Sequence, residues 1–178
     1  MLTSPSPAPS LVLAQPPPPR PAVGPDAEAY LADKRFFLGV LGAWALLSVG
    51  GGVPLWVGGD RFERNVGIQL VAWGAIDGLL AGVGLWGLPQ ERRALADGAP
   101  LGEKRGKFRQ ALLVNALADA AYISAGALLY GLGKNDAVRG LGAGVVAQGT
   151  FLLAFDNVGV LYFLPPARAA WVGGPGLR

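Results

Sequence analysis

The sequence contains no cysteine and no histidine among its 178 residues, and charged residues make up only 15% of it. Without these two residue types the chain has no disulfide framework and no cysteine or histidine ligand for zinc, haem or an iron–sulfur cluster. It also has no histidine base to activate a serine. The composition argues against an enzyme, a metal site and a bound cofactor. Because soluble domains carry about 25% charged residues, it favours a membrane protein instead.

Long apolar segments account for most of the chain. Residues 36–59 contain no charged residue, and as a helix they would reach about 36 Å, enough to cross a hydrocarbon core of about 30 Å. Three further segments contain one aspartate each: 65–88, 110–133 and 140–164. A soluble bundle would need a polar stripe on each helix, whereas these segments are apolar on every face. The sequence predicts an all-α, integral membrane four-helix bundle over residues 26–166.

The two ends of the chain differ from this domain. Nine of the fifteen prolines lie within Met1–Pro25, so this segment is predicted to be a disordered or polyproline II tail. Residues 10–15 resemble the end of a signal peptide, and the tail therefore also fits a signal-peptide remnant. Asp26 is placed as the N-cap of a short interfacial helix that leads into the first span. Residues 167–178 form a predicted C-terminal tail.

The distribution of lysine and arginine predicts the orientation. Eleven of these residues fall on the side of the two termini and of the polar segment 91–109, which we expect to be a long loop. Four fall on the other side. The positive-inside rule then places both termini in the cytoplasm, with the bundle in a bacterial inner membrane. Cleavage of a signal peptide after Ala14 would reverse this orientation. The net charge of +3 comes mostly from the lysines and arginines on the cytoplasmic side, so no nucleic-acid partner is expected.

Three aspartates lie inside the predicted spans, where no lysine or arginine can pair with them. Counted along ideal helices from the inner ends, Asp77, Asp119 and Asp156 lie roughly 16, 13 and 12 Å deep, so they share one level. A charged aspartate at the centre of a spanning helix costs about 2.5 to 3.5 kcal/mol. We expect each carboxyl group to carry a proton or to lie against a bound cation.

Other polar side chains recur near the aspartates at helical spacing. Together they form a predicted polar cluster inside the bundle: Asp77, Asp119, Asp156, Asn115, Gln148, Gln69 and Tyr122. Such groups often join helices through hydrogen bonds worth about 0.6 kcal/mol each. The same groups could form a site for a proton or a cation. Both interpretations stay open at the level of sequence.

Glycines also recur every four residues, which lets two helix backbones approach closely. The predicted packing glycines are Gly74, Gly78 and Gly82 on the second span, and Gly140 and Gly144 on the fourth. This ridge fits packing within one chain, a homo-oligomer, or contact with a membrane-protein partner.

Several blocks resemble a group of uncharacterised bacterial four-span membrane proteins, known as a domain of unknown function. The resemblance covers about residues 37–163. It is carried by residues 38–52, 115–126 and 139–156, and by the stripe of Gln69, Trp73 and Asp77. In that group Asn usually stands where this chain has Asp77, so the resemblance places more weight on Asp119 and Asp156. Some members carry a signal peptide. The resemblance implies no activity, substrate or cofactor.

Two functions follow from these observations. The first is a structural or accessory membrane protein whose polar cluster specifies helix pairing. The second is a small proton- or cation-linked transporter or channel subunit that uses the intramembrane aspartates. An enzyme is not expected, because no nucleophile lies beside a base. The lipid bilayer is the expected surrounding of the bundle.

Overall fold

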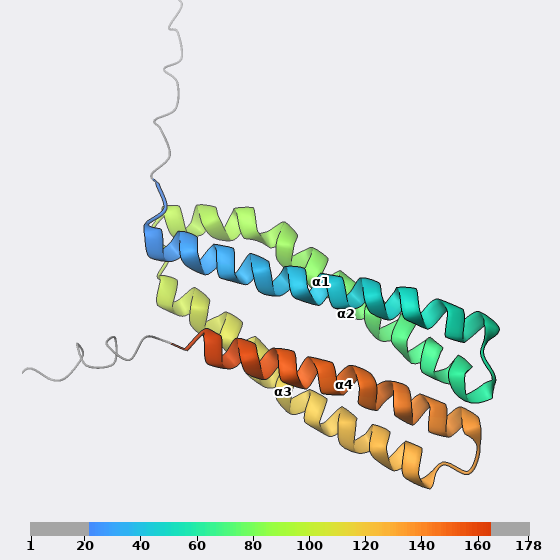
Figure 1. Ribbon diagram of the computed structural model, residues 1–178. Helices are drawn as coiled ribbons and strands as arrows, with labels where there is room; N and C mark the ends of the chain where they lie inside the picture. Colours follow the sequence, from blue (N-terminus) through green and yellow to red (C-terminus); the bar gives the residue numbers. More distant parts are fainter. Residues whose placement is uncertain (1–21, 165–178) are drawn as a thin grey trace, which may run out of the picture.

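A computed structural model describes residues 22–164, and within them the chain folds into four long helices (Figure 1). The helices are α1 (Pro25–Gly58), α2 (Arg61–Ala96), α3 (Leu101–Leu132) and α4 (Asp136–Tyr162). Each is long and apolar enough to cross a membrane. The prediction of an all-α, four-helix protein is confirmed. Residues 1–21 of the predicted tail 1–25, and the predicted tail 167–178, lie outside the described residues, and α1 begins at Pro25, the last residue of the predicted N-terminal tail.

The starts of three helices show why the chain turns where it does. The carboxylate of Asp60 accepts a hydrogen bond from the backbone N–H of Glu63 at 2.9 Å, and the Glu63 side chain accepts one from the Asp60 N–H at 3.0 Å. This capping box starts α2. Asn135 caps α4 by accepting from the N–H of Val138. At α1 the prediction was wrong: Gly24 is the N-cap and Asp26 lies in the first turn, because Pro25 suits the first helical position.

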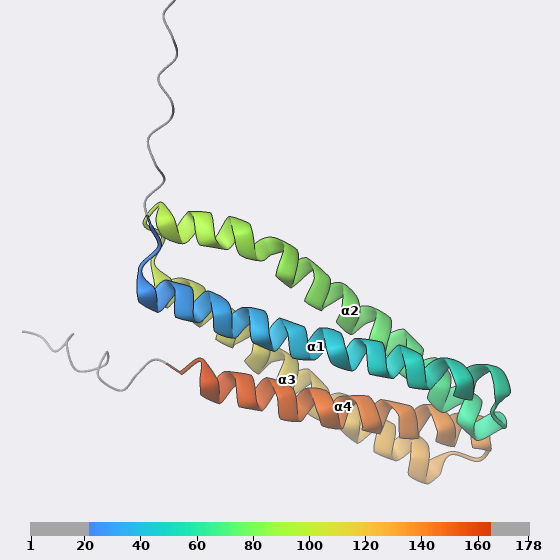
Figure 2. The same ribbon diagram turned by 45° about the horizontal axis from the view of Figure 1, so that its top comes forward.

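The predicted polar loop over residues 91–109 is mostly helical, which corrects the sequence interpretation. Helix α2 continues to Ala96 and α3 begins at Leu101, so the connection is residues 97–100. Charge alone does not end a helix, because charged side chains on one helical surface can pair, as Glu103 and Lys107 do. Pro89 lies inside α2, and Figures 1 and 2 show this helix bending toward its C-terminal end.

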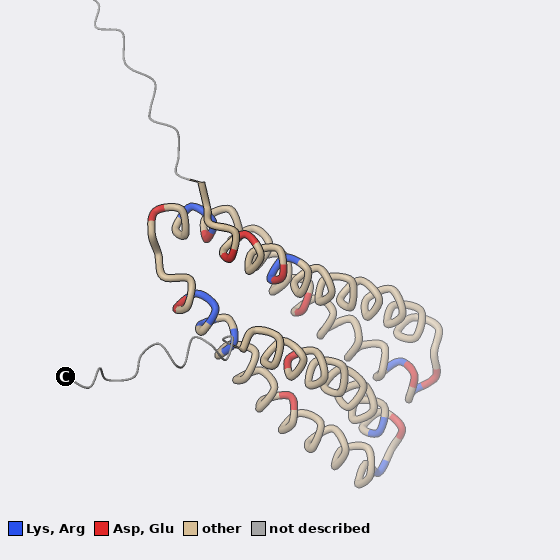
Figure 3. The backbone as a smooth tube through the Cα atoms, turned by 60° about the vertical axis from the view of Figure 1, so that its left-hand side comes forward, with Lys and Arg blue, Asp and Glu red and all other residues tan. Residues whose placement is uncertain are grey.

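The four helices form two hairpins, α1–α2 and α3–α4, whose turns lie at the same end of the molecule (Figure 1). Helix α2 also packs against α4, whereas α2 and α3 approach each other only sparsely. Most of the lysines, arginines and acidic residues gather at the two ends, and isolated acidic positions lie between them (Figure 3). The molecule therefore has the charge layout of a membrane-spanning bundle.

The two hairpins repeat one packing pattern, which the sequence interpretation did not predict. In the first hairpin a Cβ added to Gly67 would meet the carbonyl oxygen of Gly52 at 2.5 Å, and in the second a Cβ added to Gly142 would meet that of Gly126 at 2.5 Å. The number of residues that separates Gly52 on α1 from Gly126 on α3 is nearly the same as the number that separates Gly67 on α2 from Gly142 on α4. Glycine is required at these positions because the helix backbones touch.

The same two intervals relate a second pair of contacts. A Cβ on Gly84 would meet Leu38 at 2.7 Å, and one on Gly159 would meet Leu112 at 2.7 Å. The equivalence thus runs along most of each hairpin. The chain consists of two helical hairpins with equivalent internal packing.

Across the α2–α4 contact, each residue meets its own counterpart. A Cβ on Gly140 would lie 3.1 Å from that of Asn65, and one on Gly144 would lie 2.6 Å from that of Gln69. In each pair, the α4 residue follows the α2 residue by the same number of positions as Gly142 follows Gly67. Counterparts that touch each other are the mark of a two-fold relation, so the hairpins are related by an approximate two-fold axis between α2 and α4.

The predicted packing glycines have different surroundings. Gly140 and Gly144 lie in the α2–α4 contact, and Gly74 lies where an added Cβ would meet the carbonyl oxygen of Ala45 at 2.9 Å. Gly78 faces Ala45 more loosely. Gly82 has nothing within 4 Å of an added Cβ among the described residues, so the expected ridge ends before it.

Candidate functional site

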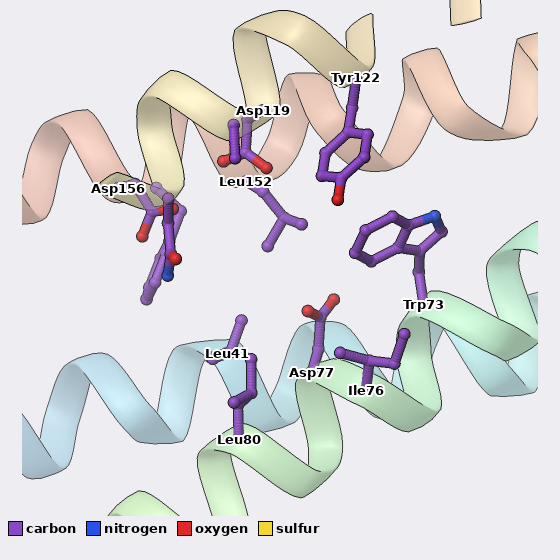
Figure 4. Close-up of a pocket in the computed structure, with 12 residues that line it drawn as sticks. Leu41, Trp73, Ile76, Asp77, Leu80, Asp119, Tyr122, Leu152 and Asp156 are labelled. Atoms are coloured by element: carbon purple, nitrogen blue, oxygen red, sulfur yellow. The ribbon is translucent and has the colours of Figure 1, made fainter. Parts of the chain in front are cut away.

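Three carboxyl groups from three helices meet at a cavity of about 210 Å³ (Figure 4). Asp77 comes from α2, Asp119 from α3 and Asp156 from α4. Their residues are buried, with 2%, 5% and 4% of their surface exposed. The cavity lies mainly between α2 and α3, the two consecutive helices that pack together least.

Two of these carboxyl groups form a close pair. Asp119 and Asp156 lie within hydrogen-bonding reach of each other. Two adjacent carboxyl groups repel each other when both are charged, and one proton between them would relieve this repulsion. Asp77 points toward them from the opposite side of the cavity (Figure 4). The arrangement provides one pair of neighbouring carboxyl groups and one separate carboxyl group.

The aspartates are not fully satisfied by the protein. The Oδ2 atoms of Asp77 and Asp119 are buried and have no hydrogen-bond partner within residues 22–164. No lysine or arginine is among the residues that line the cavity. An unpaired carboxyl oxygen at membrane depth is costly. A proton, a cation or a water molecule at the cavity would satisfy these oxygens.

The rest of the cavity wall is aromatic and aliphatic. The rings of Trp73 and Tyr122 meet edge to face with centroids 5.2 Å apart, and Asn115 also lines the space. The remaining side chains are apolar or small: Leu41, Ile76, Leu80, Ala118, Leu152 and Phe155. Among the described residues no three acidic side chains are close enough to hold one metal ion. The carboxyl groups surround a space larger than a bare ion.

The polar cluster expected from sequence is divided in the structure, which corrects that expectation. Asp77, Asn115, Asp119, Tyr122 and Asp156 line the cavity. Gln69 packs against Gly144, and Gln148 faces α1. Both glutamines stand eight residues before an aspartate of the same helix, and eight residues turn a helix about 80° past the starting direction.

Gln148 belongs to a separate network that sequence reasoning missed. Its Oε1 accepts a hydrogen bond from Nε1 of Trp44 at 2.7 Å, and its Nε2 donates to Oγ of Ser48 at 2.9 Å. The Trp44 ring stacks on Phe151 with centroids 3.8 Å apart. The four-residue spacing of Trp44 and Ser48 was the available signal, since it places both on one face of α1.

A second buried polar group joins α1, α2 and α3 at the end of the molecule where α1 begins. The hydroxyl of Tyr30 donates to Oε1 of Glu91 at 3.0 Å and to the carbonyl oxygen of Lys104 at 3.3 Å. Nζ of Lys34 donates to Oε2 of Glu91 at 2.6 Å. Burial raises the pKa of Tyr30 above its usual range, and the Glu91 carboxylate raises it further. These contacts hold α2 and α3 together beyond the cavity.

Residues 40–157 match a family described as "Family of unknown function (DUF6992)", and this range includes all three aspartates. The chain belongs to the DUF6992 family. The predicted resemblance to a domain of unknown function is confirmed. No curated protein and no solved structure matches the chain. Because the family description supplies no activity, the function has to be inferred from the cavity.

Proposed function

We propose that the chain is a multi-pass protein of the bacterial inner membrane with both termini in the cytoplasm. The four apolar helices and the placement of both helix turns at one end support this topology. The excess of lysine and arginine at the opposite end supports the orientation.

Within that membrane, the function that the geometry favours is proton- or cation-linked transport through the cavity of Asp77, Asp119 and Asp156. The observation that carries this proposal is that Asp77 and Asp119 both line the cavity, and that each has one buried carboxyl oxygen without a partner in residues 22–164. Ionisable side chains inside membrane spans often mark proton or ion pathways. Paired repeats with a polar site at their interface are a recurring plan of secondary transporters.

The arrangement suggests how a proton and a cation would be coupled. A cation at the cavity is stabilised when the carboxyl groups are charged, and a proton on the Asp119–Asp156 pair removes that stabilisation. Both ligands therefore compete for the same groups. Release of one favours binding of the other, which is the basis of exchange across a membrane.

Flux measurements on the purified chain in liposomes test this proposal. An imposed sodium, potassium or organic-cation gradient should drive proton movement, read by an internal pH dye. Asp119→Asn and Asp156→Asn should each reduce the rate at least about tenfold, because an amide cannot exchange a proton. Asp97→Asn removes an exposed carboxylate outside the spans and is the matched control. Rates equal in all variants, or no proton movement in the parent, would exclude linked transport.

A structural or accessory role is the second candidate, and the Trp44–Gln148–Ser48 network favours it, since this network joins α1 to α4. In that case Asp156→Asn should leave stability unchanged, because an amide can replace a neutral acid, while Asp156→Leu should loosen the bundle. A stable Asp156→Leu variant would count against this candidate.

A further inference from the structure

The aspartate cavity has a filled counterpart on the other side of the approximate two-fold axis. The axis relates the α1–α4 face to the α3–α2 face. Trp44 on α1 therefore corresponds to Ala118 on α3, at the interval along the chain that relates these two helices. Likewise Phe151 on α4 corresponds to Ile76 on α2, because the two residues are separated along the chain by the interval that relates α2 to α4. The two faces share a backbone plan and differ in their side chains.

On the filled face an aromatic ring occupies the space between the helices. The indole of Trp44 stacks on Phe151 with an interplanar angle of 10° and donates to Gln148. On the other face Ala118 has only a methyl group, and it lines the cavity of about 210 Å³. An engineered apolar cavity of about 150 Å³ accepts benzene. The open space therefore has the size of a ring system such as the one its counterpart holds.

The cavity also carries carboxyl groups at positions where the first hairpin, α1–α2, has alanine. Asp119 corresponds to Ala45 and Asp156 to Ala81, and both alanines are buried. Two carboxyl groups thus stand in place of two packed methyl groups. Asp77 adds a third, which is almost fully buried and points into the cavity with one oxygen unpartnered among the described residues (Figure 4).

Access to the cavity lies along the side of the bundle. Ile76, Leu80 and Tyr122 line the cavity and are also exposed on the apolar surface between α2 and α3. These residues fall within the predicted spans, where lipid would cover the surface. A molecule dissolved in the bilayer could reach the aspartates without crossing the polar ends.

We propose, building on the function proposed above, that the cavity binds an organic cation with a ring about the size of an indole, which enters from the bilayer between α2 and α3. The carboxyl groups would balance its ammonium group. Trp73 and Tyr122 lie at the same cavity and suit a cation, since aromatic ring faces attract ammonium groups. The apolar wall would receive the ring.

Binding to the full chain in nanodiscs, measured by calorimetry against empty nanodiscs, tests the charge requirement. Tryptamine carries an indole and an ammonium group, indole is its neutral analogue, and indole-3-acetate is its anionic analogue. Tryptamine should bind at least about tenfold more tightly than either analogue. Asp77→Asn should weaken tryptamine binding about tenfold, whereas Asp97→Asn should leave it unchanged.

The counterpart relation provides a test of the shape requirement. Ala118→Trp should fill the cavity as Trp44 fills its own face, abolish tryptamine binding and preserve or raise the melting temperature. Ala120→Trp, at an exposed position of the same helix that does not line the cavity, is the matched control and should still bind. Trp44→Ala should open an uncharged space that takes up indole as readily as tryptamine.

Two results would overturn the inference: equal affinity for tryptamine and indole in the parent chain, or full tryptamine binding by Ala118→Trp. The inference and the proposed function can fail separately. If Asp119→Asn abolishes cation-driven proton flux but tryptamine does not bind, linked transport stands and the occupant is an inorganic cation. If tryptamine binds as expected without any proton flux, the cavity is a binding site and linked transport is excluded.

Discussion

The indole Nε1 of Trp44 donates to Oε1 of Gln148 across 2.7 Å, and this bond joins α1 to α4 inside the bundle. Gln148 is 1% exposed, and its amide nitrogen donates to Ser48. Both ends of the amide are therefore used within the protein. This hydrogen bonding distinguishes the filled α1–α4 face from the aspartate cavity, where two carboxyl oxygens lack such partners within the described chain.

Replacing Gln148 by leucine should destabilise the bundle by about 1–2 kcal/mol, because the buried Trp44 N–H and Ser48 hydroxyl would lose their partner. Denaturation in detergent, followed by circular dichroism, measures the change. Gln110→Leu alters an exposed glutamine and should have little effect. A Gln148→Leu variant as stable as the parent would show that the network does not hold the two helices together.

Adding one methyl group to Gly67 should have a large effect. The Cβ of alanine would meet the carbonyl oxygen of Gly52 at 2.5 Å and the backbone nitrogen of Trp56, so α1 and α2 would have to separate. We expect a loss of about 1–3 kcal/mol in the free energy of unfolding. Gly82→Ala is the control on the same helix, where nothing lies within 4 Å among the described residues. It should be neutral or slightly stabilising, because alanine favours helix.

Equal losses from Gly67→Ala and Gly82→Ala would show that helix contact at Gly67 is not close. The corresponding change in the second hairpin, Gly142→Ala, should behave like Gly67→Ala, since a Cβ there would meet Gly126 at 2.5 Å. Similar effects in both hairpins would support the equivalence of their packing.

The stability of the bundle should depend on Tyr30 at alkaline pH. Its pKa in the folded protein is raised above the ordinary value of 10.0, chiefly by burial and then by Glu91. Above about pH 10 the unfolded chain loses this proton first and binds fewer protons than the folded chain, so the free energy of unfolding falls as pH rises. This contribution is present below that pH and is lost above it.

Tyr30→Phe should remove that part of the alkaline loss and should lower stability at pH 7 by about 1 kcal/mol, since the bond to Glu91 is gone. Denaturation curves between pH 7 and pH 11 measure both effects. Identical slopes in the parent and the variant would mean that Tyr30 ionises equally easily in the folded and unfolded chain.

The orientation can be measured directly because the chain has no cysteine of its own. Asp97→Cys marks the α2–α3 connection and Lys134→Cys marks the α3–α4 turn, at opposite ends of the bundle. In intact cells an impermeant thiol reagent should label Lys134→Cys and spare Asp97→Cys. The reverse pattern would place the termini outside, as expected if a signal peptide were removed.

Sequence reasoning succeeded where a property is local to one helix. The uncharged stretch 36–59 predicts a spanning helix by its own length, and Asp119 and Asn115 share a face through their four-residue spacing. It failed where the surroundings of a side chain depend on which neighbouring helix its face meets. Gln148 and Gln69 were assigned to the aspartate cluster, yet the turn of the helix over eight residues directs them elsewhere.

The amino-acid sequence by itself determined four apolar helices and the common depth of Asp77, Asp119 and Asp156, because both follow from composition and from the rise of a helix. Only the tertiary structure decided which faces meet. Close glycine contacts at Gly67 and Gly142 bring each hairpin together in the same way, and the contact of α2 with α4 then relates the hairpins. Because Ala118 stands opposite to Trp44 in that relation, one face is filled and the other holds the carboxyl groups around an open space.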